Sequence, residues 1–173
     1  MSELSIRVAR KSDLPRLTAI YNHYVTHTAV TFDIEPYTVE SRTKWFEQFA
    51  DTGRYRLLVA ERDREILGYA GTTYFRPKAA YDTTVETTIY CAPEATGKGI
   101  GRRLYTALFA ALTNEDVCSI VAGFTLPNPA SAKLHEQLGF RTVGIFTEVG
   151  RKFGRYWDVC WTQRALHPPP NSR

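Results

Sequence analysis

A glycine-rich segment in the second half of the chain constrains the fold more than any other feature. Its residues are Thr96, Gly97, Lys98, Gly99, Ile100 and Gly101. It follows a strand-like segment that ends at Cys91, and it precedes an apolar stripe at helical spacing that includes Leu104 and Leu108. Glycines carry no Cβ, so this backbone can approach a ligand closely. A strand, a glycine loop and a helix N-terminus together form an anion site, because unpaired amides and the helix dipole both favour negative charge.

The glycine loop has possible roles other than an anion site. A flexible turn without a ligand fits the glycine pattern by itself equally well. A Walker A loop is excluded because Arg102, and not Lys with Ser or Thr, follows the last glycine. A dinucleotide-binding GxGxxG is absent, and the loop comes late in the chain instead of in a first βαβ unit. Lys98, Arg102 and Arg103 add positive charge near the glycines.

Length and composition predict one domain. The 173 residues are 43% hydrophobic, enough for a core, and we assign residues 1–166 to a single domain and 167–173 to a disordered tail with three consecutive prolines. The net charge of +4 is dispersed, which disfavours nucleic acid as a partner. No apolar run is long enough for a membrane span, and the three cysteines show no metal-binding spacing. We therefore expect no membrane partner, no metal and a cytoplasmic location.

Periodicity and turn residues predict a mixed α/β fold of the α+β type, in the order β-α-α-β-β-β-α-β-α-β-β. The predicted strands are residues 5–10, 55–61, 65–75, 83–91, 119–126, 140–150 and 155–164. The predicted helices are one that follows an N-cap at Ser12 and those at about 38–51, 99–113 and 129–138. Strands joined by a helix are expected to be parallel and the others antiparallel, which gives a mixed central sheet with helices on both faces.

The helix at 129–138 has a strong start, because Asn128 is a favoured N-cap and Pro129 suits the first helical position. Spacing divides it into two stripes. The polar stripe comprises Asn128, Ser131 and His135. The apolar stripe comprises Ala130, Leu134 and Leu138. The polar residues either contact a ligand or are only a helix cap and a surface histidine.

The strand at 83–91 carries a candidate base. Alternation places Glu86, Thr88 and Tyr90 on one face of this strand. A glutamate in such a strand is expected to be partly desolvated, which raises its pKa toward the range useful for accepting a proton from an amine. The alternative, an exposed carboxylate on an edge strand, stays open on these residues.

Several segments resemble one enzyme superfamily. Residues 128–140 resemble the signature N-x-x-[SA]-x-x-L-[YH]-x-x-x-G-F of GNAT acetyltransferases, and the glycine loop is similar to their pyrophosphate motif Q/R-x-x-G-x-G/A, with Thr96 where Gln or Arg is usual. The segments FRPKAAYD, TVETTIY and GRKFGRYWDV lie outside these motifs and are similar to segments of the phosphinothricin N-acetyltransferase family. The resemblance extends from residue 4 to residue 166.

The resemblance implies a GNAT fold, acetyl-CoA as co-substrate, and roles for particular residues. Glu86 would be the catalytic base, and His135 would protonate the departing thiolate. The cofactor-binding residues that it implies are Ile89, Tyr90, Cys91, Thr96, Gly97, Lys98, Gly99, Ile100, Gly101, Arg102, Asn128 and Ser131. The substrate-binding residues that it implies are Phe75, Arg76, Pro77, Glu86, Thr87, Thr88 and Lys152.

The resemblance further implies acetylation of the α-amino group of phosphinothricin or a methionine sulfoximine-like amino acid, by a homodimer. Arg76 would suit an anionic head group. Two alternatives remain open: a GNAT enzyme for another amine, such as a different amino acid, a polyamine or a protein amine, and a sensor that binds acyl-CoA without turnover.

Overall fold

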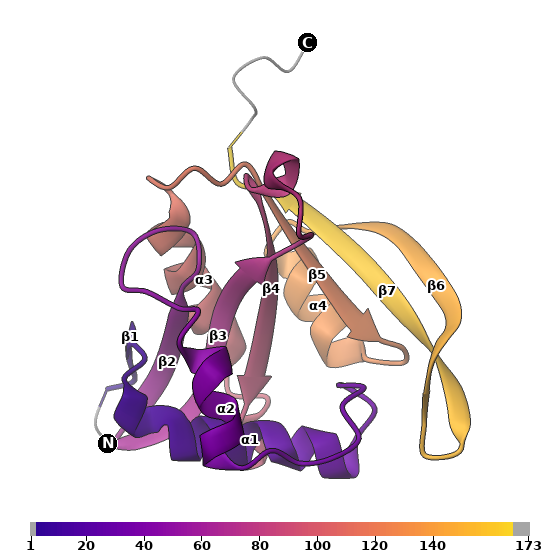
Figure 1. Ribbon diagram of the computed structural model, residues 1–173, viewed down its shortest axis with the longest axis horizontal. Helices are drawn as coiled ribbons and strands as arrows, with labels where there is room; N and C mark the ends of the chain where they lie inside the picture. Colours follow the sequence, from indigo (N-terminus) through magenta and orange to yellow (C-terminus); the bar gives the residue numbers. More distant parts are fainter. Residues whose placement is uncertain (1–2, 168–173) are drawn as a thin grey trace.

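The computed structural model describes residues 3–167 and has the predicted helices and strands in the predicted order (Figure 1). The strands are β1 Ser5–Val8, β2 Leu57–Arg62, β3 Glu65–Tyr74, β4 Thr84–Cys91, β5 Ser119–Thr125, β6 Arg141–Lys152 and β7 Arg155–Ala165. The helices are α1 Leu14–His27, α2 Val39–Phe46, α3 Ile100–Leu112 and α4 Pro129–Gln137. Residues 168–173 of the expected tail, and residues 1–2, lie outside the described residues.

The strands form one mixed sheet in the order β1-β2-β3-β4-β5-β7-β6, so the predicted fold class is confirmed. Among the described strands, β4 and β5 are the only neighbours that run parallel. The expectation that β1 and β2 run parallel is wrong, because two helices and not a single crossover helix connect them. The helix α4 leads from β5 to β6, but β7 pairs between these two strands.

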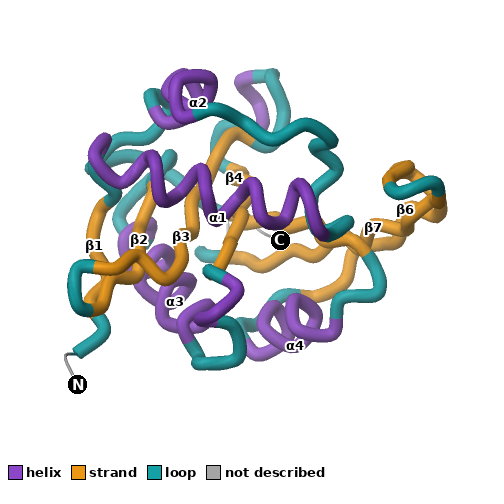
Figure 2. The backbone as a smooth tube through the Cα atoms, turned by 90° about the horizontal axis from the view of Figure 1, so that it is seen from below, coloured by secondary structure: helices purple, strands orange, loops and turns teal. Residues whose placement is uncertain are grey.

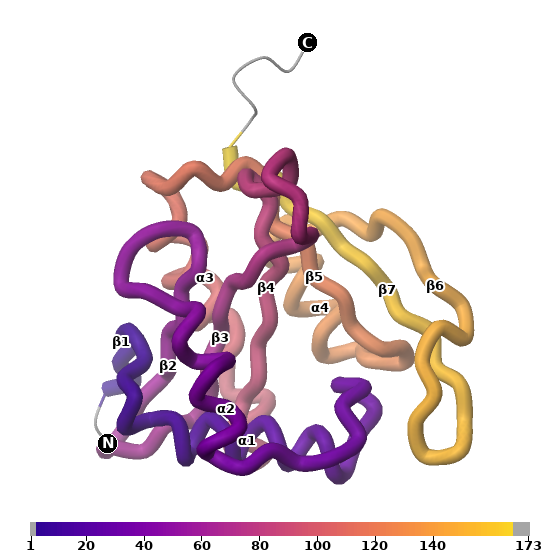
Figure 3. The backbone as a smooth tube through the Cα atoms, in the orientation of Figure 1, coloured from indigo at the N-terminus to yellow at the C-terminus, as the bar shows by residue number. Residues whose placement is uncertain are grey.

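Helices cover both faces of the sheet (Figure 2): α1 and α2 lie on one side, and α3 and α4 on the other. The apolar stripe of α3 packs against the sheet, with Leu104, Leu108 and Leu112 fully buried. Figure 3 traces the chain from β1 at one edge of the sheet to the long β6–β7 hairpin at the other. The centre of the sheet, where β4 and β5 meet, therefore lies between the two helical layers.

The predicted tight turn between β2 and β3 is confirmed, and Asp63 (φ 53°) and Arg64 (φ 65°) take the left-handed conformation that a two-residue hairpin turn requires. The prediction that Ser12 caps the first helix is wrong. A 3₁₀ turn at Lys11–Asp13 precedes α1, and Asp13 accepts a hydrogen bond from the Arg10 amide at 2.7 Å and pairs with Arg7.

Candidate active site

The strands β4 and β5 separate partway along their length. Their parallel pairing covers only Thr84–Glu86 on β4 and Ser119–Val121 on β5, after which the two strands diverge (Figure 1). Beyond Glu86, β4 keeps its pairing with β3 on one side and faces the gap on the other. Every second residue there directs its backbone amide and carbonyl into the gap, and these groups need partners. The gap therefore suits an extended ligand that carries amide groups of its own.

The glycine loop lies at the end of β4 that borders this gap and leads into α3. Gly97 and Gly99 both have φ of +74°, and a Cβ at either position would meet no protein atom within 4 Å. Gly99 is the N-cap of α3 and supplies no side chain to bond the first amides of the helix. Lys98 and Arg102 are exposed beside them. Open space, unpaired amides and positive charge fit a pyrophosphate, so these residues can hold the phosphates of acetyl-CoA.

The unusual Thr96 uses its side chain within the protein. Its hydroxyl donates to the Pro93 carbonyl at 2.9 Å and so closes the short 3₁₀ turn before the loop. Gln or Arg at this position would have a longer reach. Thr96 can contribute its backbone to the phosphate cradle, but its hydroxyl is already engaged.

The start of α4 shows the capping role that was considered as an alternative. The Asn128 Oδ1 accepts a hydrogen bond from the Ser131 amide at 3.0 Å. A Cβ on Gly101 would lie 3.2 Å from Leu134, so this glycine lets α3 and α4 approach closely. The helices that flank the gap are thus fixed against each other at its cofactor side.

The expected polar stripe on α4 is wrong at His135. This residue is 4% exposed and its ring stacks on Phe124, with Phe140 and Tyr105 packed edge-on. Nδ1 lies 2.8 Å from the Ser131 carbonyl, and Nε2 is buried without a partner. Burial lowers the pKa of His135. Ala130, expected in the core, is exposed. Leu134 and Leu138 pack against the core as expected. Spacing could not show that His135 packs as well, because Phe124 and Phe140 come from other segments.

Glu86 meets the expectation of a desolvated carboxylate. It is partly buried on the face of β4 that it shares with Thr88 and Tyr90, and its side chain makes no hydrogen bond or ion pair within residues 3–167. Burial raises the pKa of Glu86, and the nearby guanidinium of Arg76 partly offsets that rise. The structure therefore brings Glu86 and Arg76 together where β4 and β5 begin to diverge.

The segment at Phe75–Pro77 follows β3, with Phe75 half-buried and with Arg76 and Pro77 exposed on a shallow surface. The Phe75 ring lies 6.3 Å from that of Trp161 on β7, and the Arg76 guanidinium carbon lies 4.6 Å from the Phe75 ring centre. Packing on Phe75 thus holds the Arg76 guanidinium where its charge acts on the carboxylate of Glu86.

Two expected substrate contacts have side chains that are occupied elsewhere. The Thr87 hydroxyl donates to the Gly71 carbonyl at 3.0 Å on the buried face of β4. Lys152 is 5% exposed, and its Nζ donates to the Thr31 carbonyl at 2.8 Å. Lys152 therefore fastens the β6–β7 hairpin to the loop after α1, and its contact with substrate stays a prediction.

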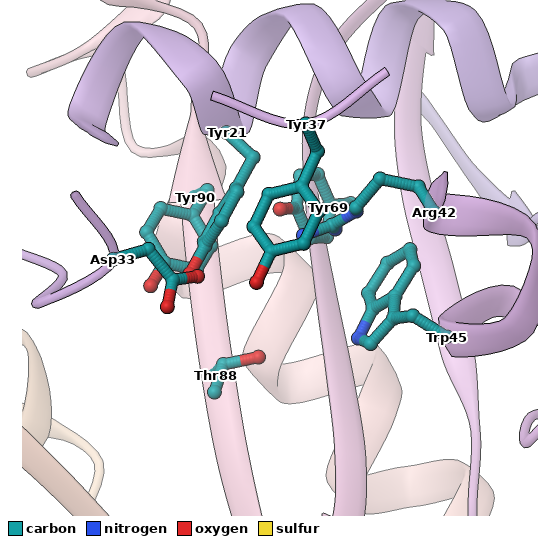
Figure 4. A pocket seen from close by; sticks show the side chains of 8 residues that line it. All are labelled: Tyr21, Asp33, Tyr37, Arg42, Trp45, Tyr69, Thr88 and Tyr90. Carbon is teal, nitrogen blue, oxygen red and sulfur yellow. The ribbon is translucent and has the colours of Figure 1, made fainter. Parts of the chain in front are cut away.

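A cavity of about 190 Å³ was not foreseen from the sequence. It lies between the sheet and the layer formed by α1 and α2, on the same face of β4 as Glu86 (Figure 4). The lining residues are Tyr21, Asp33, Tyr37, Arg42, Trp45, Tyr69, Thr88 and Tyr90. The sequence assigned Thr88 and Tyr90 to the site, but the others come from separate elements and have no common spacing. The sequence did contain one signal for this cavity, which was the cation Arg42 one helical turn before the aromatic residue Trp45.

Across residues 3–167, no group of three or more His, Cys, Asp or Glu side chains is arranged to hold a metal ion. None of the described helices is both long and apolar enough to cross a membrane.

Comparison with known proteins places this site in a family. Residues 6–161 match the acetyltransferase (GNAT) domain family. The chain is 52% identical to a phosphinothricin N-acetyltransferase of Streptomyces coelicolor, over 95% of this chain and 98% of that protein. It is 36% identical to an L-methionine sulfoximine/L-methionine sulfone acetyltransferase of Pseudomonas aeruginosa, over 95% of each chain.

A solved structure extends the likeness to the cofactor. The crystal structure of a GNAT superfamily phosphinothricin acetyltransferase from Sinorhizobium meliloti in complex with acetyl-CoA superposes with a TM-score of 0.92 at 32% identity, over 98% of this chain and 92% of that one. The glycine cradle described above is consistent with the same co-substrate. The chain therefore belongs to the GNAT superfamily and is an acetyl-CoA-dependent N-acetyltransferase of the phosphinothricin and methionine sulfoximine acetyltransferase family.

Proposed function

We propose that this enzyme acetylates the α-amino group of phosphinothricin or of a methionine sulfoximine-like amino acid by direct transfer from the thioester. The observation that carries the proposal is the partly buried Glu86 beside Arg76, where β4 and β5 diverge. Glu86 can accept a proton, and Arg76 can bind an anionic or polar head group. The names of the relatives support the same class of acceptor.

Glu86 serves as the base in this proposal. An ammonium group has no lone pair, so the acceptor amine must lose a proton before its nitrogen can attack the acetyl carbonyl. Bound acetyl-CoA supplies that activated carbonyl and a thiolate leaving group. Desolvation makes the Glu86 carboxylate a stronger base than an exposed glutamate, because its pKa is raised. The ammonium proton passes to Glu86 before the C–N bond forms, and the second proton that the nitrogen loses on acylation goes to the departing CoA thiolate.

The role of His135 as proton donor to the departing sulfur stays a prediction. Its Nδ1 faces a carbonyl, which a protonated Nδ1 satisfies, so a neutral ring leaves Nε2 as an acceptor. Donation from Nε2 requires the imidazolium, and burial disfavours that charged form. The aromatic cage that surrounds the ring gives His135 a packing role in addition.

Arg76 binds the head group in this proposal. A guanidinium offers paired donors in fixed geometry to a phosphinate, and single donors to a sulfoximine or sulfone. The exposed Lys78 follows two residues later and adds positive charge to the same surface. A site built on such donors should reject acceptors that lack the head group, because its donors would then be left unpaired.

A panel of acceptors tests the proposal. Release of CoA thiol from acetyl-CoA should be measured with phosphinothricin, methionine sulfoximine, methionine sulfone, glutamate and spermidine. We expect the highest kcat/KM with one of the first three, and an increase in KM for that acceptor in Arg76→Ala. A preference for spermidine or a peptide amine would overturn the acceptor assignment and leave the enzyme class intact.

We further propose a homodimer that forms through the β6–β7 hairpin. Large apolar side chains are more than half exposed along this hairpin, which is unusual for a monomer surface. They are Val143, Ile145, Phe146, Val149, Phe153 and Tyr156. Light scattering should give twice the chain mass for the wild type and a smaller mass for Phe146→Glu. A monomeric wild type at micromolar concentration would refute this. The cytoplasm as the location remains a prediction from the cysteine content.

A further inference from the structure

The cavity between α1, α2 and the sheet contains a buried cation that has no anionic partner in the part of the chain that the structure describes. Arg42 on α2 is 5% exposed. Its guanidinium carbon lies 3.8 Å from the Trp45 ring centre and 4.3 Å from that of Tyr21, so the group is held between two aromatic faces. These faces stabilise the positive charge, but they accept none of its in-plane hydrogen bonds.

The unsatisfied donors of Arg42 are the informative detail. Nε and Nη2 are both buried, and neither makes a hydrogen bond of good geometry. The buried Tyr69 hydroxyl is close enough for the charge of Arg42 to offset part of the rise that burial causes in the pKa of Tyr69, but a single hydroxyl cannot satisfy both nitrogens. These two nitrogens share one edge of the planar guanidinium and form one of its two forks for a carboxylate. Buried polar groups are nearly always paired, so a missing pair of adjacent donors indicates a ligand with two acceptor oxygens.

The cavity around this fork extends to the face of β4 that carries Glu86. Thr88 lines it and lies on the same face of β4 as Glu86, about 7 Å further along the strand. In Figure 4, Arg42 enters the cavity from one side and Asp33 from the other, with Thr88 between them. Asp33 accepts a hydrogen bond from the Tyr21 hydroxyl, and its negative charge would repel a second anion. Asp33 therefore disfavours a carboxylate at its own end of the cavity and leaves the Arg42 end as the place for an anion.

We propose that the Arg42 fork binds the α-carboxylate of the acceptor amino acid and so determines that the enzyme acetylates amino acids and not simple amines. The proposal rests on the function proposed above and assigns a second subsite to it. The acceptor lies over Thr88 with its amine toward Glu86 and its carboxylate against Arg42. The head group extends toward Arg76, outside the aromatic cavity.

A pair of acceptors that differ in one group tests the fork. L-Methionine sulfone and its α-carboxamide have the same head group, but the amide lacks the carboxylate charge. We expect the wild type to prefer the acid in kcat/KM by about 30-fold or more, the smaller end of the usual effect of unpairing a buried charge. In Arg42→Gln the ratio of acid to amide should fall toward one, mainly through KM of the acid. The two amines differ in basicity, but this difference cancels when the ratio is compared between variants.

A matched control distinguishes loss of the Arg42 cation in the cavity from loss of any positive charge on α2. Lys44→Gln removes a cation from the exposed face of the same helix and should keep the wild-type ratio. If Arg42→Gln does not fold, Arg42→Met keeps an unbranched apolar stem between Tyr21 and Trp45. Equal losses for acid and amide in a folded Arg42 variant would show a structural role and overturn the proposal, as would a wild type that does not discriminate.

A binding measurement distinguishes this failure from failure of the proposed function. If the wild type acetylates neither acceptor, the proposed function fails, but the fork is still testable by thermal shift without acetyl-CoA. A ligand that binds the native state raises Tm. L-Methionine sulfone should then raise Tm of the wild type and of Lys44→Gln, but not of Arg42→Gln, and the amide should raise none of them. No shift with the wild type would overturn the proposal.

Discussion

The substitution Glu86→Gln should affect activity and stability in opposite directions. Gln has nearly the same size and cannot accept a proton. Removing a general base costs about 10²–10⁴ in kcat/KM, which is about 2.7–5.4 kcal/mol in the activation free energy. An exposed carboxylate with no role would change little, because surface substitutions usually stay within about 0.5 kcal/mol. The two interpretations of Glu86 therefore differ by more than the error of a rate measurement.

The stability effect follows from the raised pKa of Glu86. Because the folded protein holds the proton on this carboxyl more tightly than the unfolded chain does, ionisation of Glu86 opposes folding once the pH exceeds its ordinary pKa. Gln carries no charge, so the variant should melt at a higher temperature than the wild type at pH 7. This gain should disappear in acid, where Glu86 is protonated in both states.

The assay combines initial rates with thermal unfolding across pH. Acetyl-CoA binding, followed by calorimetry, should be unchanged in Glu86→Gln, and the rate deficit should shrink at high pH because more of the acceptor amine is already deprotonated. Glu65→Gln, on the exposed end of β3, is the control and should change neither rate nor Tm appreciably. A wild-type rate for Glu86→Gln at neutral pH would refute the base assignment.

Three further substitutions test other parts of the site. Gly99→Val places a branched side chain at φ +74° in the phosphate cradle, so we expect a sharp rise in KM for acetyl-CoA; unchanged binding in calorimetry of a folded variant would contradict the cradle. Gly150→Ala puts a Cβ 2.2 Å from the Phe32 ring, so the loop before Asp33 must move and KM for the acceptor should rise more than KM for acetyl-CoA; equal kinetics to wild type would show that the loop does not shape the acceptor site. His135→Ala removes a caged ring and should lower stability by about 2–5 kcal/mol, with a smaller loss of kcat than Glu86→Gln; full stability with a loss as large as that of Glu86→Gln would instead support a purely catalytic role.

The local sequence determined the elements and the phosphate cradle. Alternating residues in β4, the glycines before α3 and the Asn-Pro start of α4 are short-range signals, because each depends on backbone conformation within a few residues. Alternation gave the face of β4 on which Glu86 lies, but it left open whether this carboxylate is desolvated or exposed, and the resemblance to the acetyltransferase family favoured the desolvated base that the structure shows. The order of elements followed from these local features and was confirmed in full.

Only the tertiary structure decided how distant segments meet. The gap between β4 and β5, the insertion of β7 between β5 and β6, and the direction of β1 relative to β2 depend on pairing across the sheet. The aromatic cage of His135 and the cavity around Arg42 likewise join segments that are far apart in the chain and share no period. Burial of these two polar groups, and with it their unpaired nitrogens, results from contacts that no window of sequence contains.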